Sequence, residues 1–303
     1  MIISSYLTQI ELNAMSTADQ AEQTALLQVS TGKRVNVDSD DPSAAAGEVG
    51  ISAQSGDCDQ FLRSIASIST ELQTADSALN SGVTALQQAI SLGVEGANGT
   101  MSQQDRAALA NEVQGISQQM LGIANLSYNG KYIFAGTADS QPPYVTAADG
   151  SVVYQGNDSV NQVEIEAGES IAVNQPGSQL FSAAGASVFQ ALSDLATTLQ
   201  SDSSTTDDIA NATNEVRNAY DQFNSARTFY GSTLDQLNAS QDFLNSEQLQ
   251  LTQQSSNLVG VDMNQAATNL TNAETARNAA LQAAASVGNL SLFNYLGTST
   301  STI

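Results

Sequence analysis

Histidine and tryptophan are both absent from this chain of 303 residues, and cysteine occurs only once. Without histidine the chain lacks the commonest general base and the commonest metal ligand of proteins. Cys58 has no imidazole partner that could activate it as a nucleophile, and a single cysteine cannot form an intramolecular disulfide. We interpret Cys58 as an ordinary helix residue and predict no catalytic, cofactor-binding or metal site.

Basic residues are scarce, because lysine and arginine together number 8 against 31 acidic residues, and the net charge is −23. The eight basic residues are scattered along the sequence and form no cluster. Nucleic acid is bound by neutralising its phosphates, and anionic lipid surfaces also attract basic clusters. We therefore expect neither nucleic acid nor an anionic membrane surface as a partner.

Long apolar runs are missing as well. No window reaches the roughly 20 apolar residues that a helix needs to cross a bilayer. The N-terminal sequence MIISSYLTQIELNAMS has neither the basic start nor the continuous apolar core of a Sec signal peptide. We expect a soluble chain without membrane insertion, which would need another route if it is exported.

The two ends of the chain carry narrow apolar stripes in which residues recur at intervals of three and four, the spacing of one helical face. Alanine fills much of both stripes, so each helix buries little area by itself and needs a partner surface. We predict that the two end helices pair with each other and with equivalent helices of neighbouring copies. The predicted assembly interface comprises Ile3, Leu7, Ile10, Ala14, Met263, Ala266, Leu270, Ala273, Ala280, Ala284, Val287, Leu290 and Leu292.

Heptad spacing also marks the segments between the ends. Asp41 followed by Pro42 is a typical helix start, and it predicts a long helix from residue 42 to about residue 94. Ser102 and Asp105 predict the cap of a second helix that runs to about residue 125. The clearest periodicity extends from Ile209 to Leu258 and predicts a helix that packs antiparallel to the other two.

The pattern changes between residues 128 and 176, where three of the four prolines lie. The dipeptide Asp149-Gly150 is a strong hairpin signal. This segment predicts a small β insert that leans on the helices or on neighbouring molecules, because it is too small for a large core of its own. Its predicted strands are Tyr132–Phe134, Val152–Tyr154, Val163–Ile165 and Ile171–Val173.

Together these patterns predict a mainly α fold with an inserted small β domain. The helices form an elongated antiparallel bundle or coiled coil in which the N- and C-terminal helices pair at one pole. We divide the chain into a terminal coiled-coil assembly domain, a helical-bundle rod domain and an inserted β-rich outer domain. Their expected boundaries are 1–41 with 259–303, 42–127 with 185–258, and 128–184.

Two chemical interpretations remain open at this point. Asp38, Asp40 and Asp41 resemble part of a calcium loop, but the central glycine and closing glutamate of an EF-hand are missing. The many acidic residues also leave open a carboxylate pair for glycoside hydrolysis, although no large β or α/β scaffold is predicted to hold a sugar cleft. Acidic residues on helices are more simply solvated faces, so we do not predict an enzyme.

A family resemblance enters through the block that starts at Ser30 and contains Lys33, Arg34 and Val35, then residues 40–42 and 44–46. This block is similar to the N-terminal signature of the bacterial flagellin superfamily. Within that superfamily, three segments resemble members found between the hook and the filament more than filament flagellins. They are NGKYIFAGT (129–137) with the following Pro-Pro-Tyr, DGSVVYQGN (149–157), and the ending LSLFNYL (290–296).

The resemblance implies a structural subunit at the hook–filament junction of the bacterial flagellum. Such a protein is expected outside the cell, exported by the flagellar type III system without a cleaved signal peptide. Its expected partners are copies of itself, an adjacent hook-associated protein, flagellin, and a cytoplasmic export chaperone that binds the C-terminal region. Two alternatives remain, namely a short filament flagellin and a secreted helical binding module or adhesin.

Overall fold

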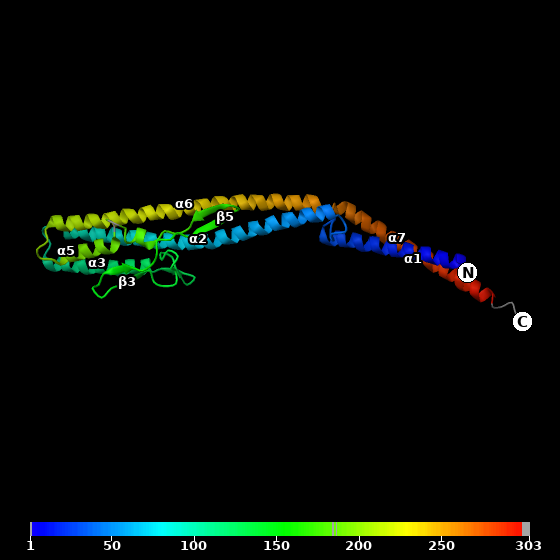
Figure 1. Ribbon diagram of the computed structural model, residues 1–303, viewed down its shortest axis with the longest axis horizontal. Coiled ribbons are helices and arrows are strands. Elements are labelled where there is room, and N and C mark those ends of the chain that lie inside the picture. Colours follow the sequence, from blue (N-terminus) through cyan, green and yellow to red (C-terminus); the bar gives the residue numbers. More distant parts are fainter. Residues whose placement is uncertain (1, 184, 186, 299–303) are drawn as a thin grey trace. The chain divides into compact units, whose positions relative to one another are not determined.

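The computed structural model describes residues 2–183, 185 and 187–298, with side chains placed between residues 9 and 286 of those ranges. Long helices dominate it (Figure 1). The helices are α1 (Ile2–Thr31), α2 (Pro42–Gly96), α3 (Gln103–Ala124), α4 (Gly177–Leu180), α5 (Val188–Gln200), α6 (Thr206–Val259) and α7 (Met263–Thr298). The mainly α fold with a β insert is confirmed, and the observed starts of α2 and α3 match the expected caps.

The chain separates into two compact units. The first contains Met1–Asp57 and Ser246–Ile303, and the second contains Cys58–Asn245. Helices α2 and α6 contribute to both units, because each of them extends across a unit boundary. The division into three domains with the boundaries given above stays a prediction.

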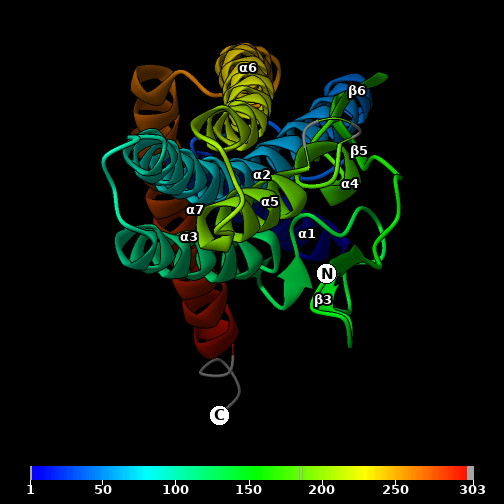
Figure 2. The ribbon, with the colours of Figure 1, turned by 90° about the vertical axis from the view of Figure 1, so that its left-hand side faces the viewer.

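In the second unit, α2 and α6 run antiparallel. Arg227 Nε donates to Asp76 Oδ1 at 2.9 Å, and further along the pair Gln87 Nε2 donates to the Tyr220 hydroxyl at 3.0 Å. Helix α3 packs beside α5 (Figure 2). The apolar faces of these helices meet in a core that includes Leu79, Leu86, Met120, Leu195 and Phe223, each 0% exposed.

Gly82 of α2 permits a close approach to α6. A Cβ atom at this position would lie 2.6 Å from Cε1 of the fully buried Phe223 ring. Gly115 in α3 is a matched control, because it is exposed and a Cβ there would meet nothing within 4 Å.

We expect Gly82→Ala to lower the free energy of unfolding by about 1–3 kcal/mol through overpacking. Gly115→Ala should instead raise it by up to about 1 kcal/mol, because alanine has the higher helix propensity. Urea unfolding followed by circular dichroism measures both changes. Equal effects of the same sign would contradict the packing role of Gly82.

The β insert consists of three two-stranded antiparallel sheets in the described part of the chain. The Asp149-Gly150 hairpin is confirmed, since Gly150 has a φ of 86° in the turn between β3 and β4. Asn129 and Gly130, with φ values of 50° and 79°, form the turn of another hairpin that sequence reasoning missed. The strands are β1 (Ser127–Tyr128), β2 (Lys131–Tyr132), β3 (Tyr144–Thr146), β4 (Val152–Tyr154), β5 (Gln162–Glu166) and β6 (Glu169–Ala172).

One predicted strand needs correction. The segment Tyr132–Phe134 was expected to be extended throughout, but β2 ends at Tyr132 and the next two residues enter a turn. The Phe134 side chain is 0% exposed and meets Phe181 edge to face, with ring centroids 5.3 Å apart. Its apolar character therefore reflects a long-range packing contact and not a β-strand.

Aromatic side chains join the insert to the helices. Tyr144 of β3 lies 5.2 Å from Phe189 of α5, and Phe181 lies 5.2 Å from Phe223 of α6, measured between ring centroids. The backbone of Tyr144 is also held from both sides by the Asn125 amide, at 2.8 and 2.9 Å. The insert thus leans on the bundle and shares its core.

Burial raises the pKa of Tyr144, whose hydroxyl also bonds with Ser182 at 3.2 Å. The phenol of an unfolded chain ionises near pH 10, whereas the buried phenol keeps its proton to higher pH. The folded state is therefore fully stabilised below about pH 10, and this stability is lost as the pH rises above that value. We expect the urea midpoint to fall more steeply above about pH 10 for the native chain than for Tyr144→Phe. The difference in urea midpoint between the native chain and Tyr144→Phe at pH 8 isolates the loss of the hydroxyl contact. If the two midpoints fell equally with pH above about pH 10, the prediction would be contradicted.

Candidate assembly interface

The terminal helices pair with each other in the first unit. Helix α7 lies against α1, so the expected partnership of the two ends is observed (Figure 1). On α7 the contact face is the predicted stripe, in which Ala266 is 0% exposed, Ala273 is 8% exposed, and Leu270 is half-buried. Ala280 and Ala284 continue this face as half-buried residues. Small side chains let the two helix backbones approach closely.

The contact face of α1 is not the one expected to meet α7. Met15 and Ala18 are half-buried and Ala25 is 5% exposed, whereas Ile10 is 47% exposed and Ala14 is exposed as well. At 100° per residue, the predicted stripe lies about a quarter-turn away from the buried face. The sequence could not separate these faces, because alanine and larger apolar residues occur on both.

The predicted interface residues therefore differ in exposure. Ile10, Ala14 and Met263 are exposed, and the α7 residues described above face α1 within the same chain. The side chains of Ile3, Leu7, Val287, Leu290 and Leu292 lie outside the described residues. On α1 the larger apolar side chains Leu12, Leu26 and Leu27 are also at least 45% exposed. Single exposed apolar residues are common on protein surfaces, whereas several on one helix make α1 a candidate for protein–protein contact.

An ion cluster links the two helices. Arg277 is the sole basic residue in the sequences of α1 and α7. Its Nε lies 2.7 Å from Asp19 Oδ1 and 3.2 Å from Glu22 Oε2, and that Glu22 oxygen is buried. Sequence reasoning noted the scarcity of charge in these helices but did not pair these residues. The cluster fixes the register at which α7 lies along α1.

The loop between α1 and α2 holds the junction between α6 and α7. Gly32, with a φ of 69°, ends α1. Arg34 N–H then donates to the Val259 carbonyl at 2.7 Å, and Val261 N–H donates to the Gly32 carbonyl at 3.0 Å. Lys33 and Gly260 form an antiparallel bridge. Residues more than 220 positions apart in the sequence are thus joined by backbone hydrogen bonds.

A small apolar core sits under this loop. Val35 is 7% exposed and packs with Ala44 and Val259, each 3% exposed, with Leu258 beside them. Above them the Arg34 Nη2 donates to Asp41 Oδ2 at 3.0 Å and to the Leu258 carbonyl at 3.1 Å. The signature block therefore works as a clamp, which we define as residues 32–41 with 258–261.

The acidic residues of the clamp act as local acceptors. Asp41 caps α2, since its Oδ1 accepts from Ala44 N–H at 3.1 Å, which confirms the expected N-cap. Asp40 Oδ2 accepts from the N–H groups of Asn36 and Val37 at 2.9 and 3.1 Å. These backbone hydrogen bonds lower the pKa of both carboxyl groups. The geometry thus accounts for Asp40 as a turn former and for Asp41 as a helix cap.

The described residues also bear on metal and membrane sites. They contain no group of three or more histidine, cysteine, aspartate or glutamate side chains arranged to hold a metal ion. None of the described helices combines the length and hydropathy that a bilayer span requires. The features that stand out at the chain ends are therefore the helix pair, its exposed apolar residues and the clamp.

Comparisons with known proteins agree with this arrangement. The bacterial flagellin N-terminal helical region matches residues 3–139, and the bacterial flagellin C-terminal helical region matches residues 213–296. Flagellar hook-associated protein 3 of Salmonella typhimurium is 35% identical over 167 residues, which is 54% of this chain and 52% of that protein. Flagellin D of Vibrio anguillarum is 28% identical over 140 residues, 46% of this chain and 37% of that protein. The chain thus spans about half the length of the hook-associated relative.

A solved structure shows the same fold. A solved structure of a Vibrio parahaemolyticus protein aligns with a TM-score of 0.69 at 20% sequence identity, over 73% of this chain and 100% of that one. The two flagellin regions together match well over half of the chain, and they contain both helices of the terminal pair and both sides of the clamp. The chain therefore belongs to the bacterial flagellin family.

Proposed function

We propose that this chain is a structural subunit of the bacterial flagellum that forms the junction between hook and filament and has no catalytic role. The observation that carries the proposal is the α1–α7 pair, which leaves Ile10 and other large apolar side chains exposed after the two helices have packed. A monomer gains nothing from such a surface in water. Packing against α1 and α7 of neighbouring copies would bury it.

The junction role is favoured over that of a filament flagellin by the relatives. The similarity to a hook-associated protein is higher in identity and longer than the similarity to a flagellin, at 35% over 167 residues against 28% over 140. The proposed partners are copies of the chain, an adjacent hook-associated protein on one side, and flagellin on the other. A cytoplasmic chaperone would cover the C-terminal region before export through the flagellar type III apparatus.

A deletion strain tests the proposed place in the flagellum. Cells without this protein should build hooks, fail to grow filaments, and release flagellin into the medium. Normal filaments in the deletion strain would contradict the junction role. Loss of filaments without flagellin in the medium would point to a filament subunit instead.

Complementation with two α1 variants tests the proposed surface. Ile10→Asp places a charge in the exposed apolar stripe and should not restore filaments. Gln20→Asp adds the same charge at an exposed position of α1 whose neighbours three and four residues away are all polar, and it should restore them. Immunoblots of the exported fraction control for secretion, and equal complementation by both variants would show that the stripe is not an interface.

The alternative of a secreted binding module predicts stable ends in the isolated monomer. Assembly-coupled packing predicts the opposite, because thin alanine-rich stripes offset little of the entropy lost on ordering, about 1–2 kcal/mol per residue. Limited proteolysis of the purified monomer distinguishes the two. Early removal of both ends, with a protected second unit, supports the junction subunit, and resistant ends support the binding module.

A further inference from the structure

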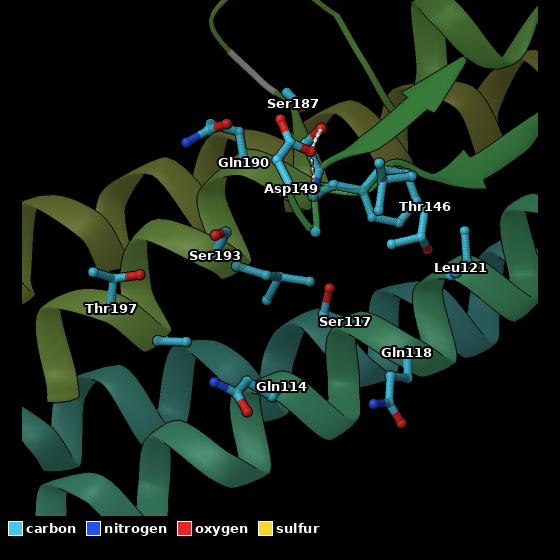
Figure 3. Close-up of a pocket in the computed structure, with 16 residues that line it drawn as sticks. Gln114, Ser117, Gln118, Leu121, Thr146, Asp149, Ser187, Gln190, Ser193 and Thr197 are labelled. Carbon is cyan, nitrogen blue, oxygen red and sulfur yellow. Dashed lines mark hydrogen bonds between the residues drawn. The ribbon is translucent and has the colours of Figure 1, made fainter. Parts of the chain in front are cut away.

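A groove in the second unit lies outside the proposed assembly surface. It has a volume of about 540 Å³ and is lined by α3, α5 and the turn of the β3–β4 hairpin (Figure 3). This volume falls within the range of about 300–1,000 Å³ that is common for small-molecule sites. Figure 3 shows Gln114 and Ser117 of α3 on one side and Ser193 and Thr197 of α5 on the other.

The groove offers hydrogen-bonding groups that the fold does not use. The side chains of Gln114, Ser117, Ser193 and Thr197 make no hydrogen bond to other described residues. An amide supplies two donors and an acceptor, and each hydroxyl can donate and accept. Such groups match a ligand whose own groups both donate and accept. Leu121, Val152 and Ala196 also line the groove and offer contact for C–H surfaces.

The groove is almost uncharged although the chain carries a net charge of −23. Asp149 is the one charged residue among those that line it, and its Oδ1 already accepts from the N–H and hydroxyl of Ser151 at 3.0 and 2.7 Å. No basic side chain is present to bind an anion, and a single occupied carboxylate is a poor cation site. The lining therefore suits a neutral ligand.

A peptide is less suited to this groove than a sugar. A peptide that binds by adding a strand needs an open strand edge, and here the hairpin contributes its turn instead. The backbone groups of that turn are engaged, since Ala147 N–H donates to the Ser151 carbonyl at 2.8 Å and Gly150 N–H donates to the Ala147 carbonyl at 3.0 Å. We infer that the groove between α3, α5 and the β3–β4 turn binds a neutral oligosaccharide.

Calorimetric titration of the full chain tests this inference. The probes are two neutral sugars, maltotriose and triacetylchitotriose, an anionic sugar, trigalacturonate, and a Ser/Thr-rich hexapeptide. At least one neutral sugar should bind, and the double variant Gln114→Ala with Ser117→Ala should weaken that binding about tenfold through loss of two hydrogen bonds. Ser193→Trp, which fills the groove, should abolish it.

Gln119→Ala is the matched control, because Gln119 is exposed on α3 but does not line the groove. It should leave binding unchanged, and circular dichroism should show that all variants keep the native helix content. The inference is overturned if neither neutral sugar binds at a concentration of about 10 mM, which is tenfold above a dissociation constant of about 1 mM. It is also overturned if the anionic sugar or the peptide binds more tightly, or if both groove variants bind like the native chain.

Discussion

Replacing Arg277 by glutamate should separate α1 from α7 while the second unit stays folded. The substitution places a third carboxylate beside Asp19 and Glu22, and it leaves the buried Glu22 oxygen facing like charge. Removing one partner of a fully buried ion pair costs about 3–5 kcal/mol. Arg277 is 45% exposed, so solvent screening reduces the expected cost to about 1–3 kcal/mol.

That cost is large for this helix pair, because its small side chains bury little apolar area. Since about 1.4 kcal/mol changes an equilibrium tenfold, the paired form should lose most of its population. Hydrogen exchange at short exchange times measures the result as lost protection of α1 backbone amides, because the native pair in the isolated chain is formed but opens readily. Arg217→Glu is the control, because Arg217 contacts Asn214 of its own helix at 2.8 Å and belongs to the second unit.

Exchanging the two charges between the helices makes the hydrogen-exchange test of the ion cluster more specific. In the double variant Arg277→Glu with Asp19→Arg, an opposite pair is restored across the helices, and part of the lost protection should return. The cluster would have no role in pairing if Arg277→Glu changed α1 exchange no more than Arg217→Glu does. A general loss of helix content would instead mean that the effect is not confined to the pair.

The second large effect is expected at the clamp. Val35→Asp should cost about 3 kcal/mol or more, because it puts an unpaired carboxylate into the core with Ala44 and Val259. Val37→Asp in the same loop should change the free energy of unfolding by about 0.5 kcal/mol or less, since Val37 is 54% exposed. The two variants carry identical charge and lie two residues apart in the same loop, so burial is the main difference between them.

Amide exchange at Arg34 and Val261 reports this effect directly, because their N–H groups join the loop to the junction of α6 and α7. We expect rapid exchange of both amides in Val35→Asp and near-native exchange in Val37→Asp. Equal protection in the two variants would show that the apolar core does not hold the clamp closed. In cells, Val35→Asp should also fail to support filament growth.

Sequence patterns were sufficient for the long helices. The heptad run from Ile209 to Leu258 lies within α6, which spans Thr206–Val259, and the Asp41-Pro42 start of α2 is observed at that residue. Such signals are local, because spacing and capping act within a few turns. The family block around Val35 was visible as a motif, but its role as a clamp depends on residues more than 220 positions away.

Features that depend on distant contacts could not be predicted in the same way. Phe134 looked like a strand residue and is instead part of an aromatic contact with Phe181. The face of α1 that meets α7 could not be read from the sequence, because Ile10 and Met15 are both apolar and only the partner decides which one is covered. The interface between copies stays a prediction for the same reason.

The central claim is that the chain ends assemble with neighbouring copies at the boundary between hook and filament. Cryo-electron microscopy of intact flagella tests it most directly. We predict a zone of this subunit at that boundary, with α1 and α7 paired and the stripe containing Ile10 buried against an adjacent copy. A zone that lacks this subunit, or a stripe that faces solvent in the assembled structure, would contradict the account.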